Sequence, residues 1–146
     1  MRLSIDDVAQ FFRAHRALMV FVNRRLGVTT AKLDTPEAYA LLPPEVRSEV
    51  HQAMLDHAEL IDAFVEENPS RLGAEDLEIV RAWKHFVTGT FYAYRPLRDH
   101  MVFLSTTEPV IAYGVLALFT PFEALLGTNL PRMIDTTLLP FKGRIV

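Results

Sequence analysis

A change in the spacing of apolar residues near Gly89 constrains the fold of this 146-residue chain more than any other feature. Up to Val87, apolar residues recur every three to four positions, which is the spacing of one face of an α-helix. Residues 90–118 instead form three short runs of aromatic and β-branched residues, separated by turn residues, as is typical of strands. The sequence therefore predicts a single α+β domain, helical in residues 1–88 and a sheet in residues 89–146.

Four helices are expected in the first part. Ser4 and Asp7 have the spacing of a capping box, so the first helix should begin there, and Gly27 can end it in the left-handed conformation. Asn68 precedes Pro69, which ends the third helix because the residue before proline is pushed out of the helical region. The expected helices cover residues 5–26, 36–42, 45–67 and a segment that begins near residue 74.

The second part is expected to form a small antiparallel sheet or half-barrel of four to five strands, with the helical layer packed on one face. Short connections favour antiparallel neighbours, so a meander is expected. Gly114 within a strand indicates a bulge or a close backbone approach. A short helix capped by Thr120 should plug one end of the sheet. The expected strands cover residues 90–95, 100–105, 110–118, 132–139 and 141–146.

The composition excludes several classes of protein. The chain has no cysteine, so disulfides, thiolate metal sites and cysteine nucleophiles are excluded. No apolar run approaches the roughly 18 residues of a membrane span, and the chain does not start with a basic and then apolar leader. We therefore expect a soluble cytoplasmic protein that does not bind a membrane.

No pattern of catalytic, cofactor-binding or metal-binding residues stands out. His51 and His57 are six positions apart, so on one helix they point in different directions and do not form a chelating pair. His15, His85 and His100 stand alone, and a metal site assembled in three dimensions from histidines and acids stays open. Six glycines are few for a loop that cradles a cofactor. We expect no cofactor and no metal.

Asp135 is the one candidate catalytic carboxylate. It alternates with Met133 and Thr137, and we expect it to face inward. Burial would raise its pKa unless Arg132 or Arg144 paired with it, and a structural salt bridge or an edge-strand charge is the simpler interpretation. The sequence contains no nucleophile elbow, phosphate loop or dinucleotide fingerprint. An enzyme is therefore the weakest of three hypotheses.

Aromatic and cationic residues of the sheet region are candidates for a binding surface. Aromatic side chains can stack on bases while cations contact phosphates. However, aromatic residues are common in any strand, and a formal net charge of −3 argues against a strong binder of nucleic acid. A small nucleic-acid-binding β module is therefore the alternative hypothesis. The candidate binding residues are Tyr92, Tyr94, Arg95, Arg98, Lys142 and Arg144.

The main hypothesis is a non-enzymatic binding or regulatory protein that acts through protein–protein association. The first helix is apolar over more than one face, and such a helix is usually covered by something else, often a second copy of the chain. The final strand can also be extended by a partner strand. We therefore expect a homodimer. The residues that widen the apolar face of the first helix are Phe11, Phe12, Val20 and Phe21.

Five segments spread over most of the chain carry a family resemblance. They are Leu3-Ser4, residues 60–65 with Asn68-Pro69, Asp76-Leu77 leading to Trp83-Lys84, residues 113–116 and residues 138–145. Together they resemble an uncharacterised family of bacterial proteins with a C-terminal motif LLPFxGRI. In that family the motif continues with a Tyr-Asp-Gly segment, so the resemblance implies that this chain stops inside its final hairpin. It implies no activity and no functional residue.

Overall fold

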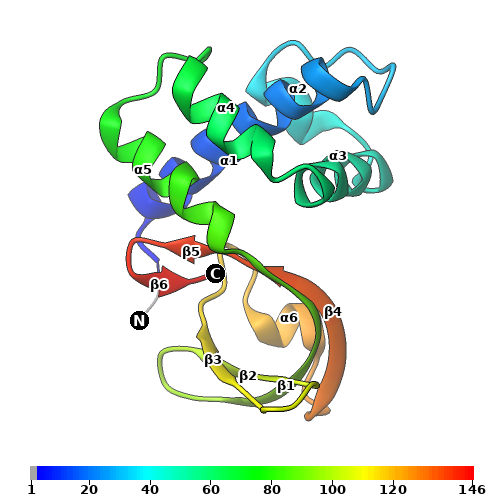
Figure 1. Cartoon of the computed structure of the whole chain (residues 1–146). Coiled ribbons are helices and arrows are strands. Elements are labelled where there is room, and N and C mark those ends of the chain that lie inside the picture. Colours follow the sequence, from blue (N-terminus) through cyan, green and yellow to red (C-terminus); the bar gives the residue numbers. More distant parts are fainter. Residues whose placement is uncertain (1–2) are drawn as a thin grey trace. The chain divides into compact units, whose positions relative to one another are not determined.

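The computed structural model describes residues 3–146, which divide into two compact units (Figure 1). Ala9–Lys84 is helical, whereas residues 3–8 join His85–Val146 in a unit built around the sheet. The predicted α+β class, with helices first and a curled sheet after them, is confirmed. The single domain and the packing of helices on the sheet stay predictions.

Helix α1 (Ile5–Leu26) begins and ends where the sequence predicts. The Asp7 amide donates a hydrogen bond of 3.0 Å to Ser4 Oγ, which is the predicted cap. Gly27 follows the helix with a φ of +62°. The buried face of α1 holds nine residues: Gln10, Phe11, Ala14, Ala17, Leu18, Met19, Val20, Phe21 and Val22.

The predicted third helix is two helices. α2 (Pro36–Leu41) is the predicted second helix. The third is divided into α3 (Pro44–Asp56) and α4 (Glu59–Glu67), because the chain turns at His57, whose φ and ψ are −127° and 56° (Figure 1). No glycine or proline marks the break, and a straight helix over this segment would run about 34 Å. With the bend, both α3 and α4 bury apolar side chains, such as Met54 and Phe64, in the helical unit. Tertiary packing therefore outweighs the local preference for one continuous helix.

The last helix of the helical unit is α5 (Ala74–Ala82), and the 3-10 turn η1 (Trp83–His85) follows it, with His85 as the first residue of the sheet segment. Trp83 is fully buried. Across the described residues, no helix combines the length and the apolar character needed to cross a membrane.

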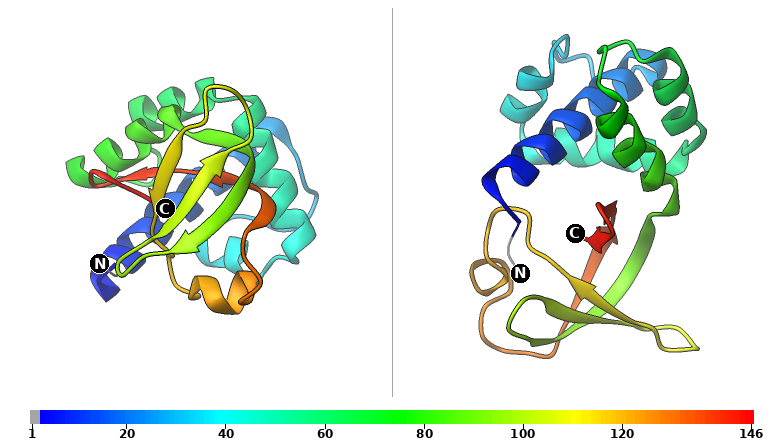
Figure 2. Two further views of the ribbon diagram at one scale, coloured as in Figure 1. Left: turned by 90° about the horizontal axis from the view of Figure 1, so that it is seen from below. Right: turned by 90° about the vertical axis from the view of Figure 1, so that its left-hand side faces the viewer.

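The sheet has six strands in the order β4-β1-β2-β3-β6-β5. Strands β1, β2 and β3 form the predicted meander. β4 returns to pair antiparallel with the other edge of β1 (Figure 2). The strands are β1 (Val87–Pro96), β2 (Met101–Ser105), β3 (Ala112–Val115), β4 (Arg132–Leu138), β5 (Pro140–Phe141) and β6 (Arg144–Ile145).

The predicted final strand, residues 141–146, is instead a hairpin of two short strands. Gly143 lies in its turn with a φ of +74°, a conformation that favours glycine. β6 lies between β3 and β5, so the last strand is not an open edge of the sheet. The edge of the sheet on this side is β5, which contains the first residue of the predicted strand, and extension of this edge by a partner strand stays a prediction.

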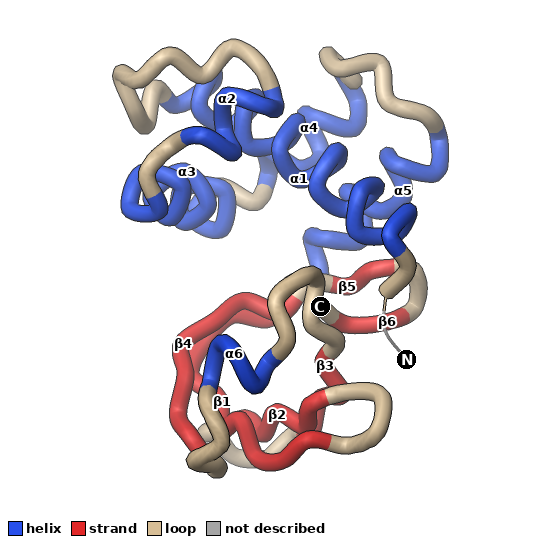
Figure 3. Tube along the Cα trace, turned by 180° about the vertical axis from the view of Figure 1, so that it is seen from behind, coloured by secondary structure: helices blue, strands red, loops and turns tan. Residues whose placement is uncertain are grey.

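The concave face of the curled sheet forms the core of this unit. α6 (Phe122–Leu126) lies on that side, and Phe122 and Leu126 pack against the sheet residues (Figure 3). The helix begins after Pro121 and makes no side-chain cap, so the predicted cap at Thr120 is not used. The core residues of the sheet are Phe91, Ala93, Met101, Phe103, Val115 and Leu138.

Gly114 marks a close approach, one of its two predicted roles. A Cβ at this position would lie 2.8 Å from Cδ2 of His100, because the imidazole ring covers the glycine. The bulge of the sheet lies elsewhere, between Ala93 and Arg95 of β1.

Candidate functional site

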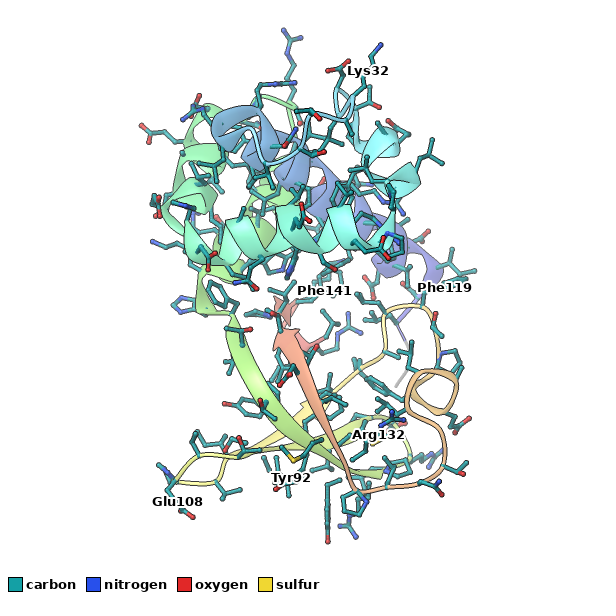
Figure 4. The ribbon with its side chains drawn as sticks, turned by 90° about the vertical axis from the view of Figure 1, so that its right-hand side faces the viewer. Lys32, Tyr92, Glu108, Phe119, Arg132 and Phe141 are labelled. Carbon is teal, nitrogen blue, oxygen red and sulfur yellow. The ribbon has the colours of Figure 1, made fainter. Side chains whose placement is uncertain are left out.

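A row of apolar side chains crosses the outer, convex face of the sheet. Tyr92 of β1 lies opposite Met133 of β4 and Leu104 of β2, and Leu104 lies opposite Ala112 of β3. Because side chains alternate along a strand, these residues face away from Phe91 and the concave core. Tyr92 points away from the curled sheet (Figure 4), and 41% of its surface is exposed, compared with 57% for Met133.

A tyrosine and an arginine flank this row on one side. The bulge in β1 places Tyr94 beside Arg95, and the Arg95 guanidinium lies 5.8 Å from the centre of the Tyr94 ring. Both residues are exposed. The structure therefore brings together three of the predicted binding residues, Tyr92, Tyr94 and Arg95.

A carboxylate flanks the row on the other side. Asp135 of β4 lies opposite Thr90 of β1 and accepts a hydrogen bond from the Thr90 hydroxyl. Asp135 is exposed, so the prediction that it faces inward is wrong, and Ile134 takes the inward position instead. Asp135 does alternate with its neighbours along β4, but its side chain lies on the convex face together with that of Met133.

Neither of the arginines proposed as partners for Asp135 pairs with it. Arg132 donates to the Leu126 carbonyl over 3.1 Å. Arg144 lies on β6 and donates to Asp7 Oδ2 over 3.0 Å. Within residues 3–146, the Thr90 hydroxyl is the only side-chain group in polar contact with Asp135.

The other predicted binding residues lie away from the apolar row. Arg98 is exposed in the connection between β1 and β2. Lys142 Nζ donates to Asp7 Oδ1 over 2.8 Å, and Arg144 binds the second carboxylate oxygen. These two cations lower the pKa of Asp7 far below its usual range. β2 and β3 separate their hairpin from β1, so Lys142 and Arg144 do not join the tyrosines.

The chain itself covers the wide apolar face of α1. Phe11 packs on Trp83, with ring centres 5.3 Å apart, and Phe21 packs on Phe64 at 5.4 Å. Phe11, Val20 and Phe21 are all buried. Phe12, the fourth of the predicted residues, is half-buried, with the Arg16 guanidinium 4.9 Å from the centre of its ring. Most of the wide apolar face therefore belongs to the core of the helical unit, and self-association through it stays a prediction.

Sequence reasoning missed a cluster of histidines and aromatic rings in the helical unit. The rings of His15 and His51 are 5.5 Å apart, and His15 also contacts Phe11, Tyr39 and Trp83. Burial, with smaller contributions from His51 and Arg16, lowers the pKa of His15 to about 3. The available signal was that His15 follows Phe11 by four positions, which puts both on one helical face.

His15 and His51 are each half-buried. Burial lowers the pKa of His51 as well, so both rings favour the uncharged form. Within residues 3–146 no group of three or more histidine or carboxylate side chains is placed to hold a metal ion.

No protein-family model, curated protein or solved structure matches the chain. The resemblance of Leu138–Ile145 and the other segments to a bacterial family stays a prediction. The functional argument therefore rests on the geometry of the described residues.

Proposed function

We propose that this protein is a non-enzymatic binding protein that self-associates through the convex face of its sheet. The observation that carries the proposal is the continuous row of Met133, Tyr92, Leu104 and Ala112 across four strands, with Tyr92 and Met133 about half exposed. Adjacent apolar side chains that face water favour association, because burying them removes apolar surface from solvent.

The residue types support an interface. Tyrosine, methionine and arginine are enriched at protein–protein interfaces, and tyrosine often carries much of the binding energy. Tyr92, Met133 and Arg95 occupy neighbouring positions on this face. Fully burying a large apolar side chain contributes about 1.5–3 kcal/mol, so two half-exposed ones contribute part of that each.

Sedimentation velocity over protein concentrations from micromolar to several hundred micromolar tests the proposal. The mass should rise from that of one chain, 16.6 kDa, toward twice that value as concentration increases. The variant Tyr92→Ser should shift the midpoint to at least tenfold higher concentration, because it removes the centre of the row.

The matched control is Leu125→Ser. Leu125 lies on α6 and is 58% exposed, so it is as accessible as the residues of the row but lies outside it. A mass that stays at one chain throughout, or a Leu125 variant as defective as the Tyr92 variant, would contradict the proposal.

Binding of single-stranded nucleic acid is the second candidate. Its support is the pair of exposed tyrosines, Tyr92 and Tyr94, beside Arg95 on one strand. It is less favoured because Lys142 and Arg144 already bind Asp7, which leaves few cations for phosphates.

Fluorescence anisotropy with a labelled thymidine oligonucleotide tests this second candidate. It predicts binding that weakens with salt and is lost in Tyr92→Ser. A flat anisotropy at low salt, with wild-type protein in excess, would remove it.

A further inference from the structure

We infer that the partner on the convex face is a second copy of the chain, related by a two-fold axis that lies in the plane of contact and runs along the apolar row, over the midpoint between Tyr92 and Met133. In this arrangement Arg95 of each protomer meets Asp135 of the other. The inference rests on the proposed self-association and adds its geometry.

The positions of the charges along the strands lead to this axis. Asp135 is two residues from Met133 on β4, and its neighbour Thr90 is two residues from Tyr92 on β1. On the opposite side, the next outward-facing position of β1 is at the bulge, where Arg95 lies opposite Val102. At about 3.3 Å per residue, each charge lies about 7 Å or slightly more from the apolar row.

This spacing of the two charges is compatible with a contact of two-fold symmetry. In such a contact, if residue i meets residue j, then j also meets i. When two faces meet, the two-fold axis lies in the plane of contact. An axis that runs along the apolar row and passes over the midpoint of Arg95 and Asp135 brings each of these charges over its opposite in the partner. The same rotation lays the row on the row of the partner, so that the two Tyr92 rings meet, and pairs of aromatic rings pack favourably.

Both charges are available for a partner. Arg95 forms no ion pair within the described part of the chain and lies beside the Tyr94 ring. The only polar contact of the Asp135 side chain within residues 3–146 is the Thr90 hydroxyl. Opposite charges placed symmetrically about an apolar centre make the face complementary to itself, which neither a uniformly basic nor a uniformly acidic partner would match.

The curvature of the sheet limits the area of contact. Two convex faces meet over a small surface, and small interfaces belong to weak or transient complexes. A dissociation constant in the micromolar range or above is therefore expected.

Charge reversal tests the geometry. Arg95→Glu and Asp135→Lys are each expected to weaken the homodimer at least tenfold, because each places like charges together twice. Mixing the two variants in equal amounts should restore association, since both cross-protomer pairs then join opposite charges. The double variant should also associate as the wild type does.

Arg98→Glu is the matched control, because it changes the same charge at an exposed position outside the row. Circular dichroism and thermal unfolding establish that each variant folds. Association of the single variants at wild-type strength, or failure of the mixture to recover, would overturn the two-fold arrangement while self-association stands. A wild-type protein that stays monomeric would overturn both.

Discussion

Replacing Asp76 with alanine is expected to lower the free energy of unfolding of the helical unit by about 2 to 3 kcal/mol. Asp76 Oδ1 accepts hydrogen bonds from Gln10 over 2.9 Å and from Arg13 over 3.0 Å, and Oδ2 accepts a second one from Arg13 over 2.9 Å. Gln10 is only 8% exposed, so the substitution leaves its amide buried without this acceptor.

Two further effects set the size of this loss. Asp76 lies in the first turn of α5, where a carboxylate favours the positive end of the helix dipole. The side chain of Arg13 is 54% exposed and can turn toward water, which keeps the loss below that of a fully buried pair.

Chemical denaturation followed by fluorescence measures this change. The single tryptophan, Trp83, is buried within the helical unit, so its emission reports on that unit. The control is Glu78→Ala on the same helix, where the carboxylate is 67% exposed and pairs with Arg81. That variant should lose less than about 0.5 kcal/mol, as exposed pairs usually do. Equal losses for the two variants would show that the Asp76 network does not stabilise the unit.

The second large effect is acid sensitivity caused by His15. We expect the free energy of unfolding to fall by about 1 to 2 kcal/mol between pH 7 and pH 5. The folded chain holds the pKa of His15 at about 3, below the ordinary value of 6.5. The unfolded chain therefore binds more protons in this range. Above about pH 6.5 both states hold His15 uncharged, and the titration of this residue costs no stability. As the pH falls from 6.5 toward 3, the free energy of unfolding decreases progressively, because the unfolded chain binds a proton that the folded chain does not.

His15→Phe should flatten this pH dependence, because phenylalanine keeps an aromatic ring beside Phe11 and cannot bind a proton. His51 should contribute in the same direction, because burial lowers its pKa too. Unfolding midpoints at several pH values, again read from Trp83, measure the effect. His57→Phe is the control, because His57 is exposed and contacts Glu59 at the surface. A slope unchanged in the His15 variant would contradict the assignment.

The sequence predicted the fold where local signals were strong. Ser4 and Gly27 bound the first helix as expected, and the change in spacing near Gly89 marks the start of the sheet region. The bend at His57 could not be predicted, because it carries no local signal and follows from packing.

The candidate site was predicted only in part, for a physical reason. Alternation along β1 groups Tyr92 and Tyr94, but it does not say which face of a strand is covered, and so Asp135 was placed on the wrong side. The apolar row itself depends on strand pairing. Met133 and Leu104 become neighbours of Tyr92 only once β4 returns to β1, which no local pattern encodes.

The methyl NMR signals of the methionines, followed as the protein is diluted, test the central claim most directly. Met133 is 57% exposed on the convex face, whereas Met19, Met54 and Met101 are 0%, 0% and 3% exposed, respectively. The signal of Met133, assigned with Met133→Leu, should shift or broaden with rising concentration while those of the buried methionines stay constant. A Met133 signal that is unchanged while the mass in solution doubles would place the contact elsewhere and contradict the account.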